Sequence, residues 1–456
     1  MTQAVSAARP LNSRLLRSAL VAALGGLLFG FDTAVISGTT RALSSVYQLS
    51  AGMLGFTVAS ALWGTVLGSL LAAKPADRYG RRACLRGLAI LYFFSALGCA
   101  FAWNWTSLLA FRFVSGLAIG GSSVIGPMYI AEIAPAAKRG RLVGMFQFNI
   151  VFGVLLAYLS NYLVSLLVLW AGLQSDEWRW KLGVAALPAA AFFLALRNIP
   201  QSPRWLVREG RVDDARRVLT EIGETDVDRA LEEIGRTVNV PHGPVERLFS
   251  RRYLRPILLA VTIGMFNQLS GINAILYYIN DIFELAGFSK ISADLQAVTI
   301  GFANLLATAI AMSVIDRLGR RKLLLTGAAG TAVCLAGVAV IFATGRHRDL
   351  LLWLLVGFIA FFAFSQGAVI WVYLSEVFPN LVRAQGQSLG SFTHWIMNAM
   401  ISAIFPVMAA SSGAAPFAFF AAMMVVQFFV VLLLYPETAG VTLERMELRL
   451  GTDRPS

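Results

Sequence analysis

Long apolar stretches alternate with short polar ones along almost the whole chain. Residues 88–101, 323–342 and 417–435, for example, contain no charged side chain. A helix of about 20 apolar residues crosses the hydrocarbon core of a bilayer. Backbone amides in lipid must be paired within the segment, and these stretches lack the alternating pattern of barrel strands, so helices are the remaining choice. The pattern predicts an all-α membrane protein with about twelve transmembrane helices, near residues 18–40, 52–74, 84–103, 105–126, 142–165, 180–198, 255–280, 294–315, 322–344, 350–373, 384–408 and 416–435.

The polar segments between these helices differ in charge on the two sides of the membrane. Cationic residues gather in the segment 199–254 and in alternate loops, at Lys74, Arg78, Arg81, Arg82, Arg86, Lys138, Arg139, Arg141, Arg317, Arg320, Arg321, Lys322 and Arg383. The other loops carry little beyond Arg41, Arg179, Lys290, Arg346 and Arg348. Basic loops stay in the cytoplasm, and an even number of helices puts both termini on one side. We therefore expect a multi-pass protein of the cell (inner or plasma) membrane with both termini cytoplasmic.

Composition changes this picture only by excluding other classes. Of the 456 residues 57% are hydrophobic and 14% are charged, whereas soluble domains have about 25% charged residues. The basic loops account for the net charge of +13, so we expect no binding of nucleic acid. The three cysteines and three histidines are scattered, and there is no GxxxxGK[ST] loop. We expect no metal site, no cofactor and no ATP-driven machinery.

Two motifs occur twice in the chain. The hexapeptide DRYGRR that begins at Asp77 returns as DRLGRR at Asp316, an offset of 316 − 77 = 239 residues. Tyr129, Glu132, Pro135 and Arg139 return 244 residues later as Tyr373, Glu376, Pro379 and Arg383. Two repeats at nearly one offset indicate two six-helix halves with a binding site between them near the middle of the bilayer. The predicted organisation is an N-terminal tail (1–17), a first half (18–198), a cytoplasmic linker with short amphipathic helices (199–254), a second half (255–435) and a C-terminal tail (436–456).

These motifs belong to a longer series that resembles the sugar porter family of the major facilitator superfamily. The series runs in family order from residue 25 to residue 444: GGLLFGFDTAVISG, DRYGRR, PMYIAEIAPAAKRG, PQSPRWL, NQLSGINAILYY, DRLGRR, WVYLSEVFPNLVRAQG and PETAGVTLE. Within the family, the bacterial proton-coupled pentose and hexose symporters are the most similar in appearance. The chain departs from the family pattern at Asn267, where the first glutamine of a pair is usual, at Gln201, where glutamate is usual, and in the tenth helix, which has QGAVIW.

The resemblance implies a sugar site that faces the central cavity. Amides match the hydroxyl groups of a sugar, and aromatic rings match its C–H face. The implied contact residues are Phe29, Gln147, Asn267, Gln268, Asn273, Asn304, Trp371, His394, Trp395 and Asn398, with Tyr277 and Tyr278 near an outer gate. An alternative for any single amide is that it only bonds a neighbouring helix.

Asp32 lies in the middle of the first expected helix, where an unpaired carboxylate costs on the order of 2.5 to 3.5 kcal/mol. It is therefore expected to be neutralised by a proton or by a partner, and Arg112 in the fourth helix is the candidate partner. By resemblance, this aspartate takes the coupling proton. The alternative is a purely structural buried ion pair.

The repeated charged motifs have a second interpretation besides topology. By resemblance they form a cytoplasmic charge latch that holds the cytoplasmic face closed when the protein is open to the outside. Its expected members are Asp77, Arg81, Glu132 and Arg139 in the first half, and Asp316, Arg320, Glu376 and Arg383 in the second half.

The function expected from these observations is proton-coupled symport of a monosaccharide by alternating access. A facilitative sugar uniporter without proton coupling is the alternative, and a sugar sensor without transport is a further one. No nucleophile, base and orienting group stand in a catalytic pattern, so we do not expect an enzyme. The expected partners are the sugar, the proton and the lipid bilayer, and the protein is expected to work as a monomer.

Overall fold

The computed structural model describes residues 12–135, 138–238, 247–379, 381–439, 441 and 443–450. All regular structure within these residues is helical, and twelve helices are long and apolar enough to cross a membrane. The predicted all-α membrane fold with about twelve spanning helices is therefore confirmed.

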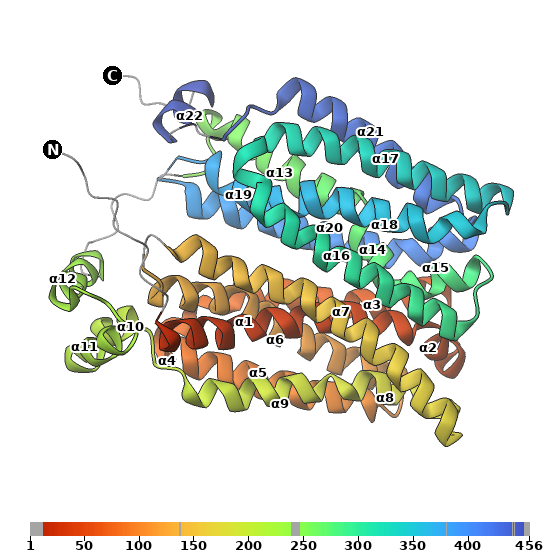
Figure 1. Cartoon of the computed structure of the whole chain (residues 1–456), viewed down its shortest axis with the longest axis horizontal. Coiled ribbons are helices and arrows are strands. Elements are labelled where there is room, and N and C mark those ends of the chain that lie inside the picture. The colour runs from red at the N-terminus through yellow and green to blue at the C-terminus, as the bar shows by residue number, and fades with distance from the viewer. Residues whose placement is uncertain are drawn as a thin grey trace.

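The helices form two groups of similar design that are joined by a third, smaller group (Figure 1). The first half contains α1 (Ser13–Val35), α2 (Thr40–Tyr47), α3 (Ala51–Leu71), α4 (Ala73–Tyr79), α5 (Arg81–Ala100), α6 (Trp105–Ile133), α7 (Arg139–Ala171), α8 (Glu177–Val184) and α9 (Ala186–Ala195). The linker contains α10 (Pro203–Arg208), α11 (Val212–Glu221) and α12 (Val227–Val238). The second half contains α13 (Leu254–Leu269), α14 (Ile272–Tyr277), α15 (Ile279–Leu285), α16 (Lys290–Leu318), α17 (Arg320–Thr344), α18 (Leu351–Phe362), α19 (Ala368–Glu376), α20 (Arg383–Ser411) and α21 (Ala415–Leu434), and α22 (Leu443–Leu450) follows it.

Several helices begin earlier than the apolar pattern indicated, because polar capping residues lie outside the apolar core. The first helix begins at Ser13 rather than near residue 18, and the Asn12 side chain accepts a hydrogen bond from the Arg14 amide at 2.7 Å. Helix α16 begins at Lys290 rather than 294, after the capping residue Ser289. A cap satisfies an amide that the first helical turn leaves unpaired.

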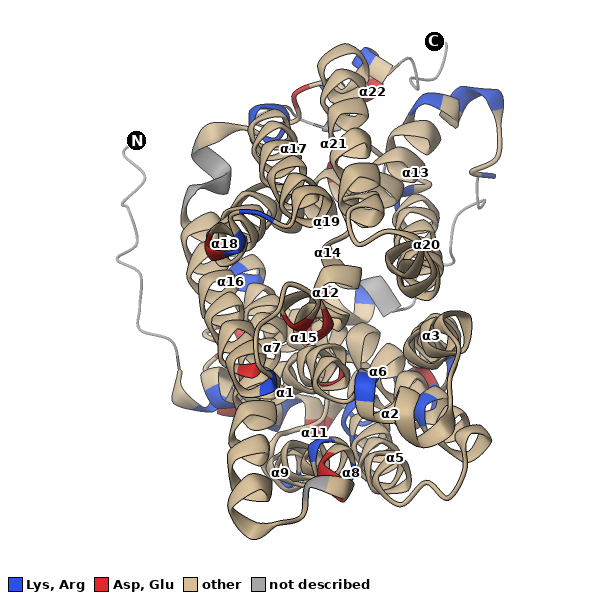
Figure 2. Ribbon diagram, turned by 90° about the vertical axis from the view of Figure 1, so that its right-hand side faces the viewer, with Lys and Arg blue, Asp and Glu red and all other residues tan. Residues whose placement is uncertain are grey.

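Within the first half α1 packs on α7 and α3 packs on α6, while across the halves α3 packs on α20 and α7 on α16. Figure 2 looks along the helices and shows the two groups next to each other, with few charged residues on their outer surfaces. Glycines allow the close approach. A Cβ at Gly30 of α1 would lie 1.8 Å from the Ile150 carbonyl oxygen of α7, and one at Gly55 of α3 would lie 2.0 Å from the Ala403 carbonyl oxygen of α20. Small residues at such contacts are the usual means of helix association in membranes.

Two of the spanning segments in the second half are interrupted. Gly271, with φ of +81°, separates α13 from α14, and a π-helical turn at Ala363–Gly367 separates α18 from α19. Discontinuous helices and π-turns commonly mark binding sites, because they turn backbone and side-chain polar groups toward a cavity. Both interruptions adjoin the polar residues described below.

The start of α1, helix α22 and the linker helices lie at one end of the molecule, which we call the linker end (Figure 1). The other end, which carries α2, α8 and α15, is called the opposite end.

Candidate functional site

Four side chains of the second half form a hydrogen-bonded set, the central polar group: Asn267, Gln268, Asn273 and His394. Gln268 Nε2 donates to Asn267 Oδ1 at 3.1 Å and lies 3.3 Å from each ring nitrogen of His394. Asn273 Nδ2 donates to Gln268 Oε1 at 3.1 Å. The helix break at Gly271 brings Asn273 back toward Gln268. The group offers several amide donors and acceptors at one place, as a polyhydroxylated ligand requires.

Aromatic rings extend this group toward the first half. The Trp371 ring lies 5.3 Å from the ring of His394, which lies 4.9 Å from the ring of Trp395. Phe29 of α1 meets Trp395 edge to face at 5.3 Å. Trp371 is 38% exposed although it lies in a spanning segment. The aromatic set therefore includes residues from both halves, as a site between them requires.

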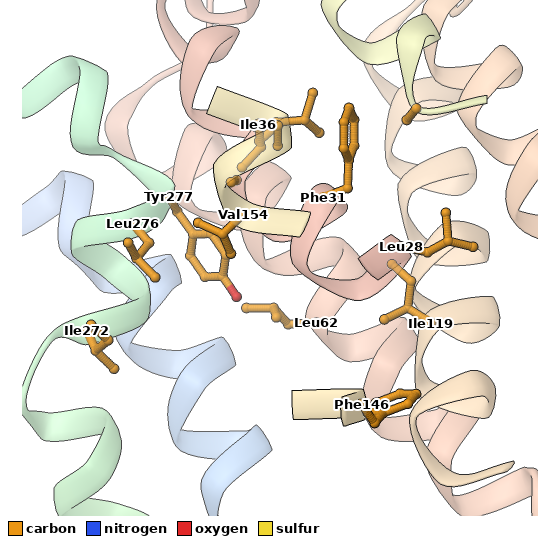
Figure 3. Close-up of a cluster of buried hydrophobic side chains, with 14 of the residues drawn as sticks. Leu28, Phe31, Ile36, Leu62, Ile119, Phe146, Val154, Ile272, Leu276 and Tyr277 are labelled. Atoms are coloured by element: carbon orange, nitrogen blue, oxygen red, sulfur yellow. The ribbon is translucent and has the colours of Figure 1, made fainter. Parts of the chain in front are cut away.

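Asn398, Tyr277 and Tyr278 lie next to this set. Asn398 Nδ2 lies 3.3 Å from the Tyr277 hydroxyl, and the Tyr278 hydroxyl donates to the Ser402 carbonyl at 3.1 Å. Tyr277 reaches from α14 toward Leu62 of the first half, in a cluster of apolar side chains where the halves meet (Figure 3). Both tyrosines are buried.

Two of the expected sugar contacts stand apart from the central polar group. Gln147 lies half-buried on α7 and Asn304 lies buried on α16. Among the described residues, neither is hydrogen-bonded to the amides of α13 and α14. Their place on two helices that pack across the halves is compatible with contact to a ligand that fills the space between.

Gln366 is a candidate that the sequence analysis did not select. It lies in the π-helical turn and is buried, and its carbonyl accepts from Asn267 Nδ2 at 3.4 Å. Its side-chain Oε1 has no hydrogen-bond partner among the described residues. A buried acceptor without a partner next to the central polar group is suited to a ligand hydroxyl. The available signal was the unusual QGAVIW string, which was noted only as a departure from the family pattern.

Asp32 and Arg112 face each other inside the first half. Arg112 Nη2 lies 3.7 Å from Asp32 Oδ2, and the Tyr92 hydroxyl donates to Asp32 Oδ1 at 3.3 Å. Asp32 is 9% exposed and Arg112 is 3% exposed. Within the part of the chain that the structure describes, the Arg112 Nε has no hydrogen-bond partner. A pair at 3.7 Å with an unsatisfied donor leaves room to rearrange. Tyr92 was not selected from the sequence, because nothing distinguishes it there from an ordinary core tyrosine.

A small cavity connects this pair to the other half. Its lining includes Phe29, Asp32, Arg112 and Tyr277. Phe29 also contacts Trp395, and Tyr277 also contacts Asn398. The charge on Asp32 can therefore affect the aromatic and amide groups through two shared residues.

The repeated motifs lie at the linker end, and each half contains an arginine–glutamate pair. Arg81 bonds Glu132 at 2.8 Å and Asp77 at 3.1 Å, and in the second half Arg320 bonds Glu376 at 3.0 Å. The side chain of Asp316 lies outside the described residues. Arg139 donates to the Ala131 carbonyl and Arg383 to the Phe378 carbonyl. All these contacts lie within one half, so the latch between the halves stays a prediction.

The opposite end holds a set of charges that the sequence analysis missed, the opposite-end charge cluster, which consists of the buried Glu177, Lys181 and Asp294 and the partly exposed Lys290. Lys181 Nζ lies 2.8 Å from Glu177 and 3.4 Å from Asp294, and Lys290 Nζ lies 2.5 Å from Glu177. Lys181 is 0% exposed and Asp294 is 1% exposed. Two of these contacts join α8 of the first half to α16 of the second. The available signal was a lysine and an aspartate of opposite charge inside expected spans.

A second ionic contact at the opposite end joins α2 to α15. Arg41 lies 2.7 Å from Glu284 and 3.6 Å from Asp281. Burial raises the pKa of Asp281 to about 7, with Arg41 opposing this shift and Glu284 adding to it.

Among the described residues, no three His, Cys, Asp or Glu side chains lie together in a way that suits a metal ion.

Comparisons with known proteins agree with this geometry. A family model described as sugar (and other) transporter matches residues 18–450. The D-xylose-proton symporter of Escherichia coli is 35% identical, with 96% of each chain covered, and the arabinose-proton symporter of Bacillus subtilis is 34% identical, with 93% of each covered. The partially occluded inward-open structure of the xylose transporter of E. coli matches with a TM-score of 0.84 and 34% identity, over 94% of this chain and 100% of that one.

Proposed function

Because this chain belongs to the family of sugar (and other) transporters, we propose that it is a proton-coupled symporter of a monosaccharide that works by alternating access. It is a multi-pass membrane protein. The linker end, where the basic loops lie, faces the cytoplasm of a cell (inner or plasma) membrane, and the opposite end faces outside. The protein works as a monomer, because one chain supplies both halves of the site.

The central polar group and the surrounding aromatic rings bind the sugar. Amides of Gln268 and Asn273 pair with hydroxyl groups, and Trp371 and Trp395 cover a ring face. Gln366 and Asn398 add an acceptor and a donor from α18–α20. The relatives named above carry xylose and arabinose, and a further relative from Synechocystis, 36% identical, is a glucose transport protein. The substrate class is therefore pentose or hexose.

The observation that carries the proton coupling is the buried Asp32 and Arg112 pair beside a cavity that reaches the second half. Deprotonated Asp32 attracts Arg112, and a proton on Asp32 removes that attraction and releases the arginine. Phe29 and Tyr277 then transmit the change to the sugar site. One proton that moves down 100 mV supplies about 2.3 kcal/mol, which sustains roughly 50-fold accumulation of sugar.

The conformation described here is closed at the opposite end. Contacts between the halves at that end include the opposite-end charge cluster and the Tyr158 hydroxyl, which donates to the Leu276 carbonyl at 2.8 Å. The high TM-score with an inward-open relative supports an inward-facing state.

Asp32→Asn tests the function. Asparagine has nearly the same shape but cannot ionise, so we expect sugar exchange to persist and proton-driven accumulation to be lost. The measurement is made in proteoliposomes with a panel of labelled pentoses and hexoses, as counterflow without a gradient and as uptake with the interior alkaline. Uphill uptake that persists in the variant would contradict the role of Asp32. Counterflow without any uphill uptake in the wild type would favour a uniporter.

Gln268→Ala tests the position of the sugar site. Loss of this amide leaves a sugar hydroxyl unpaired in a dry cavity, at a cost of about 1 to 3 kcal/mol, so affinity should fall about 5- to 150-fold. Asn149→Ala on α7 is a matched control, because the Asn149 side chain donates only to a carbonyl of its own helix. Calorimetric titration with the transported sugar distinguishes the two. Unchanged affinity in the Gln268 variant would exclude this position.

A further inference from the structure

A cavity with six arginines in its lining lies at the linker end, between the first half and the linker. Its volume is about 500 Å³. The cationic side chains come from the beginnings of α1 and α5, from the turn after α9, and from α11 and the residue before it: Arg14, Arg17, Arg82, Arg197, Arg211 and Arg217. Two carboxylates, Asp214 and Glu221, also line it, so six positive and two negative charges leave a net charge of +4.

The two carboxylates are already paired with arginines. Arg14 lies 3.1 Å from Glu221, and Asp214 bonds both Arg211 and Arg217. Hydrogen bonds from these two arginines hold the pKa of Asp214 below its usual value, so Asp214 is ionised at neutral pH. Both carboxylates of the cavity are therefore already paired and do not neutralise its remaining arginines.

The other three arginines have no carboxylate within salt-bridge distance in the part of the chain that the structure describes: Arg17, Arg82 and Arg197. Arg82 Nη1 donates to the Ile199 carbonyl at 2.8 Å, and the Arg197 guanidinium lies over the Phe193 ring at 5.2 Å. These contacts orient two guanidinium groups without neutralising them. The positive charges of these guanidinium groups repel one another, and a bound anion would relieve the repulsion.

The geometry points to a site for a phosphate-bearing anion, either the headgroup of an anionic phospholipid or a soluble phosphorylated compound. The planar guanidinium donates two parallel hydrogen bonds to phosphate, and several guanidinium groups around one cavity suit more than one phosphate oxygen. The volume is larger than one phosphate requires, so there is room for a further part of the ligand.

The position of the cavity determines what binding does. Arg17 and Arg82 lie in the first turns of spanning helices α1 and α5. The ends of spanning helices adjoin the lipid headgroups, and basic pockets between such helices are typical headgroup sites. Arg211 directly precedes the linker helix α11 and Arg217 lies on it, and Glu221 at the end of α11 pairs with Arg14 at the start of α1. A bound anion therefore ties the linker to the first half. This site is separate from the sugar site and does not depend on which sugar is carried.

The test uses the purified full-length protein and two probes. In detergent the probe is sodium pyrophosphate, and in nanodiscs it is phosphatidylglycerol added to phosphatidylcholine. Hydrogen exchange of the amides in α10, α11 and α12 is followed as each probe is increased. We expect slower exchange in the wild type with one or both probes. Protection by phosphatidylglycerol alone identifies the headgroup as the ligand, and protection by pyrophosphate alone identifies a soluble phosphate.

The cavity variant is Arg17→Gln combined with Arg197→Gln. Its apparent dissociation constant for the active probe should rise about 30-fold, the combined effect of two cationic side chains at a lipid surface. The control is Arg204→Gln combined with Arg216→Gln, which removes the same charge from exposed arginines of α10 and α11 outside the cavity. Sugar counterflow in both variants verifies that they are folded. Absence of protection with both probes, or an equal loss in the control, would overturn the proposal.

Discussion

The two ends of the molecule use ionic contacts in opposite ways. At the linker end, Arg81 with Glu132 and Arg320 with Glu376 join helices of the same half. At the opposite end, Lys181 with Asp294 and Lys290 with Glu177 join one half to the other. Contacts within a half survive when the halves rotate, whereas contacts between halves have to break. The opposite end therefore controls the closed state of this conformation, and the linker end preserves the shape of each half.

The opposite-end charge cluster is built so that separation leaves few charges alone. Glu177 bonds Lys181 of its own helix and Lys290 of the other half, and Asp294 bonds Asn280 of its own half. The Ser165 hydroxyl lies 2.7 Å from Glu177 and 2.5 Å from Asp294, and its one hydrogen can be donated to either carboxylate. When the halves part, each carboxylate keeps one partner and gains water. The barrier to opening is thereby lower than for a simple buried ion pair.

The largest expected effect on this comparison comes from Lys181→Met. It leaves two buried carboxylates without their shared cation. Breaking a buried pair costs about 3 to 5 kcal/mol. The lower value applies because Ser165 and Asn280 still form hydrogen bonds with the carboxylates. The population of the closed state should therefore fall about 100-fold. Distances between spin labels on α2 and α15 report the opening.

Two variants serve as controls for this prediction. Asp294→Asn added to Lys181→Met removes the unpaired charge and should restore much of the closed state. The Lys290 side chain is 49% exposed, so Lys290→Gln should open the opposite end less than Lys181→Met does. Equal opening in both single variants would show that burial does not determine the strength of these contacts.

A smaller effect concerns the pH dependence of closure. Burial in the closed state raises the pKa of Asp281 to about 7, whereas an exposed aspartate has a value near about 3.9. The closed state thus binds a proton that the open state does not hold at neutral pH. Acid stabilises closure, and the advantage is lost as pH rises through about 7. Between pH 8 and pH 6 the closed population should gain about tenfold, and Asp281→Asn should remove this gain. The same spin-label distances measured across pH in both proteins check this; equal pH dependence in the two would contradict it.

The smallest effect compares the two copies of the hexapeptide motif. Glu437 accepts from the amides of Arg320 and Arg321 at 2.8 and 3.1 Å, and Gln201 accepts from the Arg82 amide at 3.3 Å. A negative charge at a helix N-terminus adds about 0.3 to 1 kcal/mol. Gln201→Glu should therefore raise the unfolding midpoint slightly, by thermal denaturation in detergent, and should weaken anion binding in the adjoining cavity. A lower midpoint would show that the two copies are not equivalent.

Much of the fold could be read from the chain because each signal was local. The length of the apolar stretches predicted the spanning helices, and the recurrence of the hexapeptide predicted the two halves. The structure adds a reason for the glycines of that motif, since Gly80 and Gly319 both have φ of +83° and each begins a helix. A Cβ at Gly80 would also lie 2.8 Å from the Gln201 side chain, and one at Gly319 would lie 2.7 Å from Glu437. Residues other than glycine rarely adopt this backbone conformation.

The candidate site was only partly accessible from the sequence. Amides and aromatic residues are conspicuous in apolar helices, so Gln268, His394 and Trp395 could be selected as candidates. Gln366 and Tyr92 could not, because their roles come from a π-helical turn and from a carboxylate 60 residues away in the chain.

The sequence by itself determined the membrane class, the number of spans and the two-fold repeat, because the bilayer imposes one length and one composition on every spanning helix. Only the tertiary structure decided which charges meet. Lys181 and Asp294 are 113 residues apart in the chain, and their contact depends on how α8 and α16 pack across the halves. The strength of an ionic contact depends on distance and on burial, and both are properties of packing rather than of any single segment.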